Sequence, residues 1–457
     1  MTLKEAVELQ KEPFLQSLAE SIRIRSVQEP PADGAPYGPN VRKCLDHALA
    51  VSKGLGFRTT DLDHQMGWCE FGEGDEMIAV LGHLDVVPEG EGWTFDPFGG
   101  EIRDGKIFGR GSMDDKGPTM AALYAMAALR DSGLPLKRRI RILFGTNEET
   151  GSNDMKYYKS HGGELPVMGF TPDGEYPVIN GEKGIINVNY EADYTQTGDV
   201  RLTKISGGSA PNVVPASARA EITCPDDMKP QLMVLAAGCD RITCTETADG
   251  FEILANGVSA HGASPELGIN AIGLLMDALG TLPLDEPLLG FVHFLSDHVG
   301  LESDGTSLGI ALSDEPSGKL TFNLGTIQGD ETSFLIRINY RYPVTFTYDD
   351  CAPICDAAFL NAGFLKVNET HKACLYLPED CELVQTLLHV YADETGLPAI
   401  PKSIGGTYAK AIPNVVAFGP IFPGDEVREH KPDEFMEIDR LMENVHIFAE
   451  ALYRLAR

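Results

Sequence analysis

The chain of 457 residues is long enough for two or three domains, each with its own core. It carries 37 Lys and Arg residues against 68 Asp and Glu residues, a formal net charge of −31, which argues against nucleic acid and anionic membranes as partners. The charged N-terminus has no apolar signal core, no apolar run reaches the length of a membrane span, and the nine cysteines include no CxxC pair. These features favour a cytoplasmic protein without membrane attachment.

The first part of the chain alternates predicted helices and strands. An unbroken apolar run at residues 78–81 is typical of a parallel strand that is buried on both faces. Strand, loop and helix in alternation favour an α/β layer with a mostly parallel sheet. In chain order, the predicted elements are helices at 2–24 (broken at Pro13) and 40–55, a strand and turn at 57–72, the strand at 78–81, a helix at 119–129, and strands at 139–144 and 167–173.

The pattern changes near residue 185, where apolar and polar residues begin to alternate as in antiparallel strands. The predicted elements here are strands at 185–190, 218–222 and 252–258, a second βαβ-like pattern at 319–344, a helix at 381–394, a strand at 415–418 and a helix at 434–455. We therefore predict an α/β fold in which a domain with a mostly parallel sheet and helices on both faces is interrupted by an inserted α+β domain with antiparallel sheets. The predicted boundaries give residues 1–184 and 382–457 to the first domain and 185–381 to the insertion.

Acidic and histidine side chains follow several of the predicted strands. In parallel sheets, polar groups beyond the carboxyl ends of the strands share one edge, where a site can form. Two histidines mixed with carboxylates and no cysteine suit zinc or manganese. His83 and Asp85, two apart on an extended strand, suit a metal ligand and its orienting group, although a polar strand end fits them equally well. The full set is His83, Asp85, Asp114, Asp115, Glu148, Glu149, Asp173 and His430.

Four motifs in order, GHLDVVP, GRGSMDDKGP, GTNEETG and TPDGEYP, resemble those of the dinuclear zinc peptidases that include carnosinase, aminoacylase, carboxypeptidase G and succinyl-diaminopimelate desuccinylase. The segments WTFDPFGG and INGEKG are most similar to the dipeptidase V branch, whose inserted domain is a long lid. The resemblance runs from about residue 14 to the C-terminus. It implies a catalytic domain interrupted by a lid, and metallopeptidase activity.

The resemblance also implies two Zn²⁺ ions per chain, for which Mn²⁺ or Co²⁺ could substitute. By matched position, His83 and Asp173 would bind one ion, Glu149 and His430 the other, and Asp114 would bridge both. The peptide bond after the bridging aspartate is typically cis in the family. His446 is the nearest alternative to His430, but it lies within the predicted C-terminal helix.

Further positions match the family's catalytic and substrate-binding residues. Asp85 would orient the metal-binding histidine, and Glu148 would take a proton from the attacking water and deliver it to the leaving amine. His261, in GVSAHGASPELGINA, matches the lid histidine that stabilises the tetrahedral oxyanion, with an ordinary loop histidine as the alternative. Arg341 offers the forked donors that match a free carboxylate. The implied substrate-binding residues are Asn212, Arg341, Gly405, Gly406 and Thr407, the last three in a glycine-rich turn without the signature of a phosphate-binding loop.

The resemblance thus implies an exopeptidase that hydrolyses dipeptides with a free amino terminus, among them the Xaa-His or β-Ala-Xaa type. A metal-bridging hydroxide would attack the scissile carbonyl, with Glu148 as general acid and base. Deacylation of N-acetyl or N-succinyl amino acids on the same metal site is an alternative, and a non-catalytic binding protein of the same fold is a remote one. The expected partner is a dipeptide or small peptide-like substrate. The long lid favours a monomer, with a homodimer as the alternative.

Overall fold

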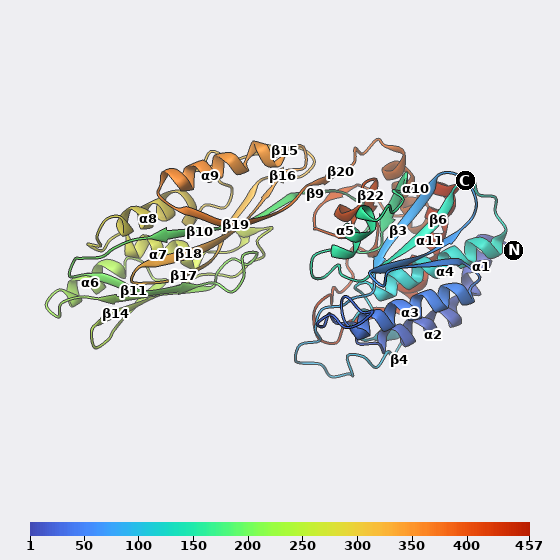
Figure 1. Ribbon diagram of the computed structural model, residues 1–457, viewed down its shortest axis with the longest axis horizontal. Coiled ribbons are helices and arrows are strands. Elements are labelled where there is room, and N and C mark those ends of the chain that lie inside the picture. The colour runs from blue at the N-terminus through green and yellow to red at the C-terminus, as the bar shows by residue number, and fades with distance from the viewer. The chain divides into compact units, whose positions relative to one another are not determined.

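The computed structural model describes residues 1–457, which divide into two compact units. Unit 1 comprises Met1–Glu182 and Leu375–Arg457, and unit 2 comprises Lys183–Cys374, so that the second unit is inserted into the first (Figure 1). The boundaries predicted from the sequence lie at 184/185 and 381/382. The chain rejoins unit 1 ahead of the next helix because β20 (Leu375–Tyr376) pairs with β9 (Ile179–Glu182).

Unit 1 is built on one sheet with the strand order β1-β2-β6-β3-β7-β22-β9-β20, in which β21 also pairs with β9. The four central strands, β6, β3, β7 and β22, run parallel, and antiparallel pairs flank them on both sides. The predicted α/β fold with a parallel sheet is confirmed in this centre. Besides β9 and β20, the strands of this sheet are β1 (Arg58–Leu62), β2 (Met66–Phe71), β3 (Met77–His83), β6 (Arg139–Gly145), β7 (Met168–Thr171), β21 (Lys402–Ser403) and β22 (Val415–Ala417).

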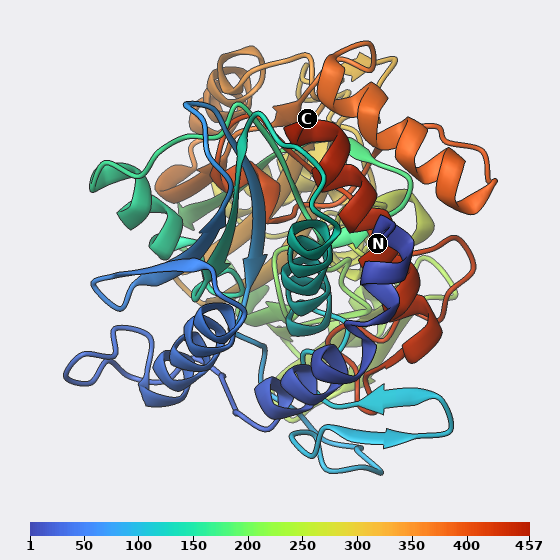
Figure 2. The ribbon, with the colours of Figure 1, turned by 90° about the vertical axis from the view of Figure 1, so that its right-hand side faces the viewer.

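Helices cover both faces of this sheet, which explains the unbroken apolar sequence of β3. Ile78 and Val80 pack in one core cluster with α4 and α11, whereas Ala79 and Leu81 pack in a second cluster with α5. The helix α4 is buried around its whole circumference over most of its length and lies beside α11; Figure 2 shows the two in teal and red. The helices are α1 (Leu3–Glu8), α2 (Lys11–Ile22), α3 (Pro39–Gly54), α4 (Lys116–Ser132), α5 (Asn153–Ser160), α10 (Glu382–Thr395) and α11 (Ile438–Ala456).

Two small sheets join the C-terminal segment of unit 1 to its N-terminal segment. One has the strand order β24-β5-β4, and the other pairs β23 with β8. Their strands are β4 (Glu101–Arg103), β5 (Lys106–Phe108), β8 (Gly174–Glu175), β23 (Pro420–Ile421) and β24 (Phe435–Glu437). A 3-10 turn, η4 (Tyr408–Ala411), precedes β22. Segments of unit 1 that are far apart in the sequence therefore pair with one another in these two sheets.

Unit 2 contains an eight-stranded antiparallel sheet in the order β13-β14-β12-β11-β17-β18-β10-β19, with its helices packed in one core cluster against it. The inserted α+β domain is thereby confirmed. The predicted βαβ-like pattern at 319–344 is wrong, because β17 and β18 pair directly as an antiparallel hairpin. The strands are β10 (Gly184–Asp193), β11 (Arg201–Gly207), β12 (Ser217–Thr223), β13 (Ile242–Glu246), β14 (Gly250–Asn256), β17 (Thr321–Asp330), β18 (Ser333–Tyr342) and β19 (Leu365–Lys372), with β15 (Ser313–Asp314) and β16 (Gly318–Lys319) as a separate pair.

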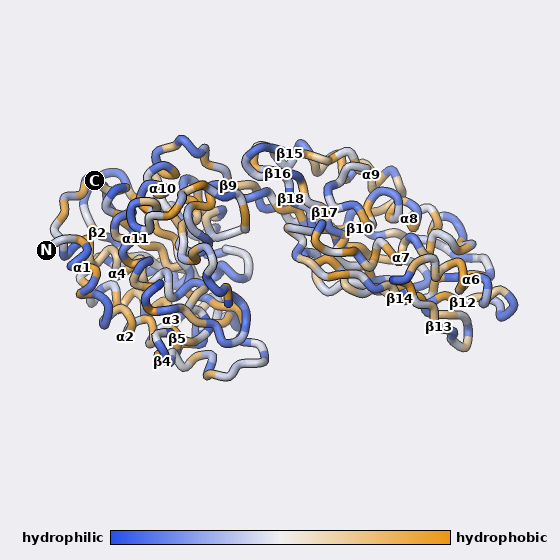
Figure 3. Tube along the Cα trace, turned by 180° about the vertical axis from the view of Figure 1, so that it is seen from behind, coloured by the Kyte–Doolittle hydropathy of each residue, from blue (hydrophilic) through white to orange (hydrophobic).

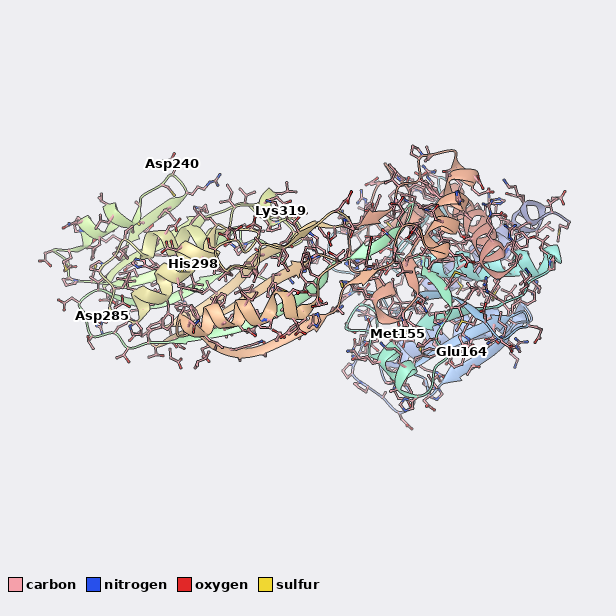
Figure 4. All side chains as sticks on the ribbon, turned by 90° about the horizontal axis from the view of Figure 1, so that it is seen from above. Met155, Glu164, Asp240, Asp285, His298 and Lys319 are labelled. Atoms are coloured by element: carbon pink, nitrogen blue, oxygen red, sulfur yellow. The ribbon has the colours of Figure 1, made fainter.

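The helices of unit 2 consist largely of apolar residues. Its helices are α6 (Lys229–Ala236), α7 (Ala271–Leu279), α8 (Leu288–Leu295) and α9 (Ala352–Asn361), with short turns η1 (Pro265–Leu267), η2 (Ser296–Gly300) and η3 (Tyr348–Asp350). Figure 3 colours apolar residues orange, and the buried ones among them form a separate core in each unit. Figure 4 labels Met155, on α5 of unit 1, and His298, which lies in η2 of unit 2 beside Phe294. None of the helices combines the length and the apolar character that crossing a membrane requires.

Candidate metal centre

The carboxyl ends of three neighbouring parallel strands bring most of the predicted side chains together. β3 lies between β6 and β7, and its last residue, His83, is paired with Gly145, the last residue of β6. Glu148 and Glu149 follow β6 in the next turn, and Asp173 lies just beyond β7. Because the three strands run parallel, these groups share one edge of the sheet.

Asp114 reaches the same place from the loop before α4. Its peptide bond to Asp115 is cis, as the resemblance implies. The carboxylate of Asp115 is buried and accepts hydrogen bonds from the His83 amide at 3.1 Å and from the Thr119 hydroxyl at 2.8 Å. Gly82 leaves room for this contact, because a Cβ atom there would collide with Thr119. Asp115 therefore ties α4 to the end of β3.

Glu434 holds the loop that carries Asp114. Its Oε1 accepts hydrogen bonds from the amides of Gly111, Met113 and Asp114 at 3.0, 2.9 and 3.3 Å. Its Oε2 accepts a hydrogen bond from the buried Arg110 guanidinium at 2.5 Å. Glu434 is itself fully buried, so this interaction fixes the loop from the inside. Breaking a buried ion pair of this kind by removing one partner typically costs about 3–5 kcal/mol.

The donor atoms form two groups that share Asp114. His83 Nε2 is 3.0 Å from Asp114 Oδ1 and 4.0 Å from Asp173 Oδ2. His430 Nε2 is 2.9 Å from Asp114 Oδ2 and 3.3 Å from Glu149 Oε1. Within each group of three residues, the possible ligand atoms lie within 4.8 Å of one another. The two carboxylate oxygens of Asp114 thus face different histidines.

The arrangement of these atoms suits the binding of cations better than hydrogen bonding among the side chains themselves. His83 Nε2 and Glu149 Oε1 are buried and have no hydrogen-bond partner, although a carboxylate or a histidine lies close to each. A buried polar atom without a partner is costly, and a divalent ion in each group would satisfy both atoms. Two imidazoles and three carboxylates are ligands that suit zinc or manganese. The residues therefore fit one ion in each group.

The balance of charge supports this fit. Burial raises the pKa of Glu148 well above its usual range, and burial together with the charge of Asp114 raises the pKa of Asp173 to about 7. The nearby carboxylates of Asp114 and Glu149 raise the pKa of His430 to about 11. The cluster thus holds more negative charge than its surroundings neutralise, and bound cations would favour the ionised carboxylates.

His83 is oriented by the main chain of Asp85. Its Nδ1 lies 2.9 Å from the Asp85 carbonyl oxygen, which can only accept, so Nδ1 carries the proton and Nε2 presents its lone pair to the site. The Asp85 carboxylate is farther from Nδ1, at 3.5 Å. It accepts hydrogen bonds from the amides of Glu148 and Glu149, each at 3.1 Å. Asp85 therefore contacts both the histidine and the glutamate turn.

His430 comes from a turn near the C-terminus. Its backbone is left-handed, with φ of 60°, a conformation that non-glycine residues seldom adopt. Its side chain is 54% exposed, which makes it the most accessible donor of the cluster. His446, the alternative named from the sequence, lies on α11 and its Nε2 is 2.8 Å from the Glu8 carboxylate of α1. It belongs to neither group of donor atoms.

The glycine-rich turn of Gly405, Gly406 and Thr407 lies in unit 1, just before η4. Thr407 donates hydrogen bonds from its amide and its hydroxyl to Glu182, at 2.9 and 2.6 Å. The next residue, Tyr408, is buried, and its ring stands edge-on to that of His83 with 6.2 Å between the centroids. The turn is therefore anchored next to a donor of the first group.

Asn212, His261 and Arg341 lie in unit 2, where backbone contacts join the segments of Asn212 and His261. The Asn212 carbonyl accepts a hydrogen bond from the amide that follows His261, at 2.8 Å, and Val213 pairs with His261 in an isolated β-bridge. Arg341 is buried on β18, and its Nε has no hydrogen-bond partner. Burial and the positive charge of Arg341 lower the pKa of His261, so that its imidazole is neutral at pH 7.

Sequence reasoning missed Glu434, Tyr408 and Asp154, which hold the loops of the cluster. Glu434 follows His430 by four residues, and Tyr408 directly follows the glycine-rich turn, so their positions next to motifs are the only signal. Asp154 lies five residues after Glu149 and has no motif of its own. An isolated acidic residue in such a place is usually solvated, and only the tertiary contacts reveal its role.

Comparisons with known proteins identify the family. Residues 79–454 match the sequence profile of Peptidase family M20/M25/M40. YtjP of Bacillus subtilis (strain 168), which carries a provisional dipeptidase name, is 38% identical over 468 residues, covering 98% of each chain. Aminoacylhistidine dipeptidase from Vibrio alginolyticus (TM-score 0.63, 14% identity, 97% of this chain and 96% of that one) and human carnosine dipeptidase 1 (TM-score 0.57, 16% identity, 99% and 98%) share the fold. The chain therefore belongs to peptidase family M20/M25/M40, a family of metal-dependent hydrolases that act on peptide bonds.

Proposed function

We propose that this protein is a dinuclear metallodipeptidase that hydrolyses dipeptides with a free amino terminus, among them the Xaa-His or β-Ala-Xaa type. The observation that carries the proposal is the pair of donor groups that share Asp114. The names of the curated relative and of the two similar structures support dipeptides as the substrate class.

Two Zn²⁺ ions, with Mn²⁺ or Co²⁺ as substitutes, are the proposed cofactors. When bound, such ions supply Lewis-acid polarisation of the scissile carbonyl and a water that loses its proton near neutral pH. The proposed ligands are His83 and Asp173 for one ion, Glu149 and His430 for the other, and Asp114 for both. The unpartnered His83 Nε2 and Glu149 Oε1 support this assignment, since each group contains one of them.

Glu148 is the proposed general base and acid. Its amide is fixed by Asp85, and burial together with the nearby carboxylates raises the pKa of its side chain. The Glu148 carboxylate would accept a proton from the attacking water and later donate that proton to the leaving amine. Asp85 would support both steps by fixing the glutamate turn and the ring of His83.

Unit 2 and the glycine-rich turn would bind the substrate. The neutral imidazole of His261 is suited to donate a hydrogen bond to the developing oxyanion. Arg341 would bind the free carboxylate with its forked donors, and the Asn212 amide would bind a neighbouring polar group. The backbone amides of Gly405, Gly406 and Thr407 would also hold the substrate carboxylate.

A panel of substrates on metal-quantified protein tests the proposal. The panel should contain dipeptides, tripeptides and N-acetyl and N-succinyl amino acids, with release of the free amino acid as the readout. We expect dipeptides with a free amino terminus to be hydrolysed fastest. Faster hydrolysis of the N-acyl compounds would assign the same metal site to a deacylase, and no turnover of any substrate would indicate a binding protein.

Glu148→Gln tests the role of the proposed base. This variant keeps the shape of the side chain but cannot take up a proton, so we expect kcat to fall about 10²–10⁴-fold with two ions still bound. The control is Glu382→Gln, which changes a glutamate whose side chain is 70% exposed on α10. Full hydrolysis by a metal-loaded Glu148→Gln enzyme would assign the base to another residue.

We also propose that the protein acts as a monomer in the cytoplasm. The inserted unit supports the first part, because a chain with its own lid can supply lid residues to its own site. Sedimentation of the full chain tests the state of assembly, and an obligate homodimer would contradict it. Cell fractionation tests the location.

A further inference from the structure

Two buried carboxylates hold four consecutive backbone amides after β6. Asp154 Oδ2 accepts hydrogen bonds from the amides of Thr146 and Asn147 at 2.6 and 3.0 Å. Asp85 accepts hydrogen bonds from the amides of Glu148 and Glu149 at 3.1 Å each. The directions of the two glutamate side chains therefore depend on both aspartates. Amide hydrogen bonds to a carboxylate are charge-assisted and stronger than those to a neutral acceptor.

Asp154 is in turn held by Tyr408. The phenol hydroxyl of Tyr408 donates a hydrogen bond to Asp154 Oδ2 at 2.6 Å, and both residues are buried, with at most 1% of either exposed. Gly145 makes this contact possible, because a Cβ atom at that position would overlap the tyrosine ring. The hydroxyl thus completes a set of donors around a carboxylate that no cation neutralises.

Tyr408 also links this carboxylate to two other parts of the cluster. Its ring packs edge-on against His83, and it directly follows Thr407, which Glu182 anchors through two hydrogen bonds of its own. The Tyr408 side chain therefore contacts a proposed metal ligand and the support of the glutamate turn, and its backbone continues the glycine-rich turn.

We propose that Tyr408 and Asp154 form a positioning pair that holds residues 146–149, and with them Glu148 and Glu149, in the geometry the site requires. The pair deepens the proposed function and rests on it. Neither residue touches the substrate. Their effect passes through the amides of the turn to the proposed base and to a proposed ligand of the second ion.

The decisive variant is Tyr408→Phe, which removes one oxygen atom and keeps the ring against His83. Mutation of a residue that orients a metal ligand typically lowers metal affinity or activity about 10–100-fold. We expect the affinity for Zn²⁺ at the second site, that of Asp114, Glu149 and His430, to fall by about that factor. Titration of the metal-free protein measures this affinity. We expect kcat to fall similarly, with KM changed less than about threefold because Glu182 still anchors Thr407.

Tyr158→Phe is the matched control. Tyr158 is fully buried in the same core cluster, lies on α5 one turn beyond Asp154, and donates its hydroxyl to the Glu164 carbonyl at 2.6 Å. Its hydroxyl also accepts a hydrogen bond from the Arg141 guanidinium at 3.0 Å. This variant therefore loses two hydrogen bonds of a buried tyrosine, and neither of them involves the glutamate turn. We expect it to lower the melting temperature at least as much as Tyr408→Phe does, with Zn²⁺ affinity and kcat unchanged.

Asp154→Asn is the second test of the pair. Because the two residues act as a unit, the double variant with Tyr408→Phe should lose little more Zn²⁺ affinity than either single variant does. Zn²⁺ affinity and kcat like those of Tyr158→Phe, in either single variant, would overturn the inference, as would fully additive losses in the double variant. A wild-type protein that hydrolyses no dipeptide, together with a weakened second ion in Tyr408→Phe, would sink the proposed function but leave the positioning pair standing.

Discussion

The two units hold their polar side chains in opposite ways. In unit 1, charged groups from distant segments meet beyond the ends of parallel strands, and buried carboxylates clamp the backbone that carries them. In unit 2, a row of neutral amides lies on one face of the antiparallel sheet. Asn187, Asn339 and Asn323 stand side by side on β10, β18 and β17, and the Asn339 amide donates to Asn187 at 2.8 Å.

The amide row in unit 2 also positions loops. Asn323 Nδ2 donates to the carbonyls of Pro211 and Val213 at 2.7 and 3.0 Å, one on each side of Asn212. Such an arrangement needs no counter-ion, whereas the cluster in unit 1 concentrates negative charge that only cations balance. Dependence on metal should therefore be confined to unit 1, while variants of unit 2 should change catalysis with the ions in place.

The largest expected effect is that of Asp114→Asn, because this residue belongs to both donor groups. One of its two carboxylate oxygens becomes an amide nitrogen, which cannot bind a cation, so we expect at most one ion per chain. Loss of several kcal/mol of Lewis-acid stabilisation should lower kcat/KM about 10³-fold. Elemental analysis and hydrolysis rates check both outcomes. The control is Asp393→Asn, which alters an exposed ion pair with Arg454 and should keep two ions. Two tightly held ions in Asp114→Asn would contradict the assignment of Asp114 as a shared ligand.

Arg341→Lys should separate binding from metal content. It keeps the positive charge but removes the fork that binds a carboxylate through two parallel hydrogen bonds. We expect KM for dipeptides to rise about 10–100-fold, which is the factor in affinity that one charge-assisted hydrogen bond contributes. Both ions should be retained. Arg337→Lys on the same strand is the control, since Arg337 lies four residues away and is exposed. An unchanged KM would remove Arg341 from substrate binding.

Asn323→Ala should have a smaller effect that is confined to unit 2. The carbonyls of Pro211 and Val213 lose their donor, which should lower the free energy of unfolding by about 1–3 kcal/mol. We expect a severalfold loss of kcat/KM with two ions still bound. Chemical denaturation and metal analysis check the prediction against Asn368→Ala, an exposed position on β19 that should change stability by less than about 0.5 kcal/mol. A loss of metal in Asn323→Ala would break the separation of the two units.

The smallest expected effect is on the titration of His261. The positive charge of Arg341 disfavours the imidazolium, so Arg341→Met should raise the pKa of His261 toward its ordinary value, while burial continues to hold it down. Histidine ring signals in an NMR titration measure this change. Arg337→Met should leave the pKa of His261 where it is. A pKa that falls in Arg341→Met would show that the two side chains interact otherwise.

The sequence was most informative where a motif follows a strand. His83 ends β3, while Glu148, Glu149 and Asp173 follow β6 and β7. The apolar run of β3 predicts a parallel strand, so the common edge of these residues could be inferred from topology alone. The strand-rich character of residues 185–381 was also visible. The hairpin of β17 and β18 was misread because both strands carry continuous buried residues at their paired ends, which hides the period of two.

The supporting residues could not be predicted because their roles exist only in the folded chain. Glu434 directly follows Asp433, and Asp154 stands between Asn153 and Met155, and neither setting indicates a buried carboxylate. Each becomes recognisable only when the backbone amides of a distant loop converge on it. Asp85 illustrates the same limit, since its position suggests a partner for His83, whereas its carboxylate also holds a turn more than sixty residues away.

The pairing of β24 with β5 has a consequence for biosynthesis. The strand that follows His430 joins a sheet whose other strands precede α4, and Glu434 at the same place closes the loop that carries Asp114. A ribosome delivers the first segment of unit 1 long before the last one, with the whole of unit 2 between them. A nascent chain that has not reached residue 430 lacks both the second histidine and this closure. Under the proposed function, peptide hydrolysis therefore begins only after residues 430–437 have been translated and have folded onto the first segment of unit 1.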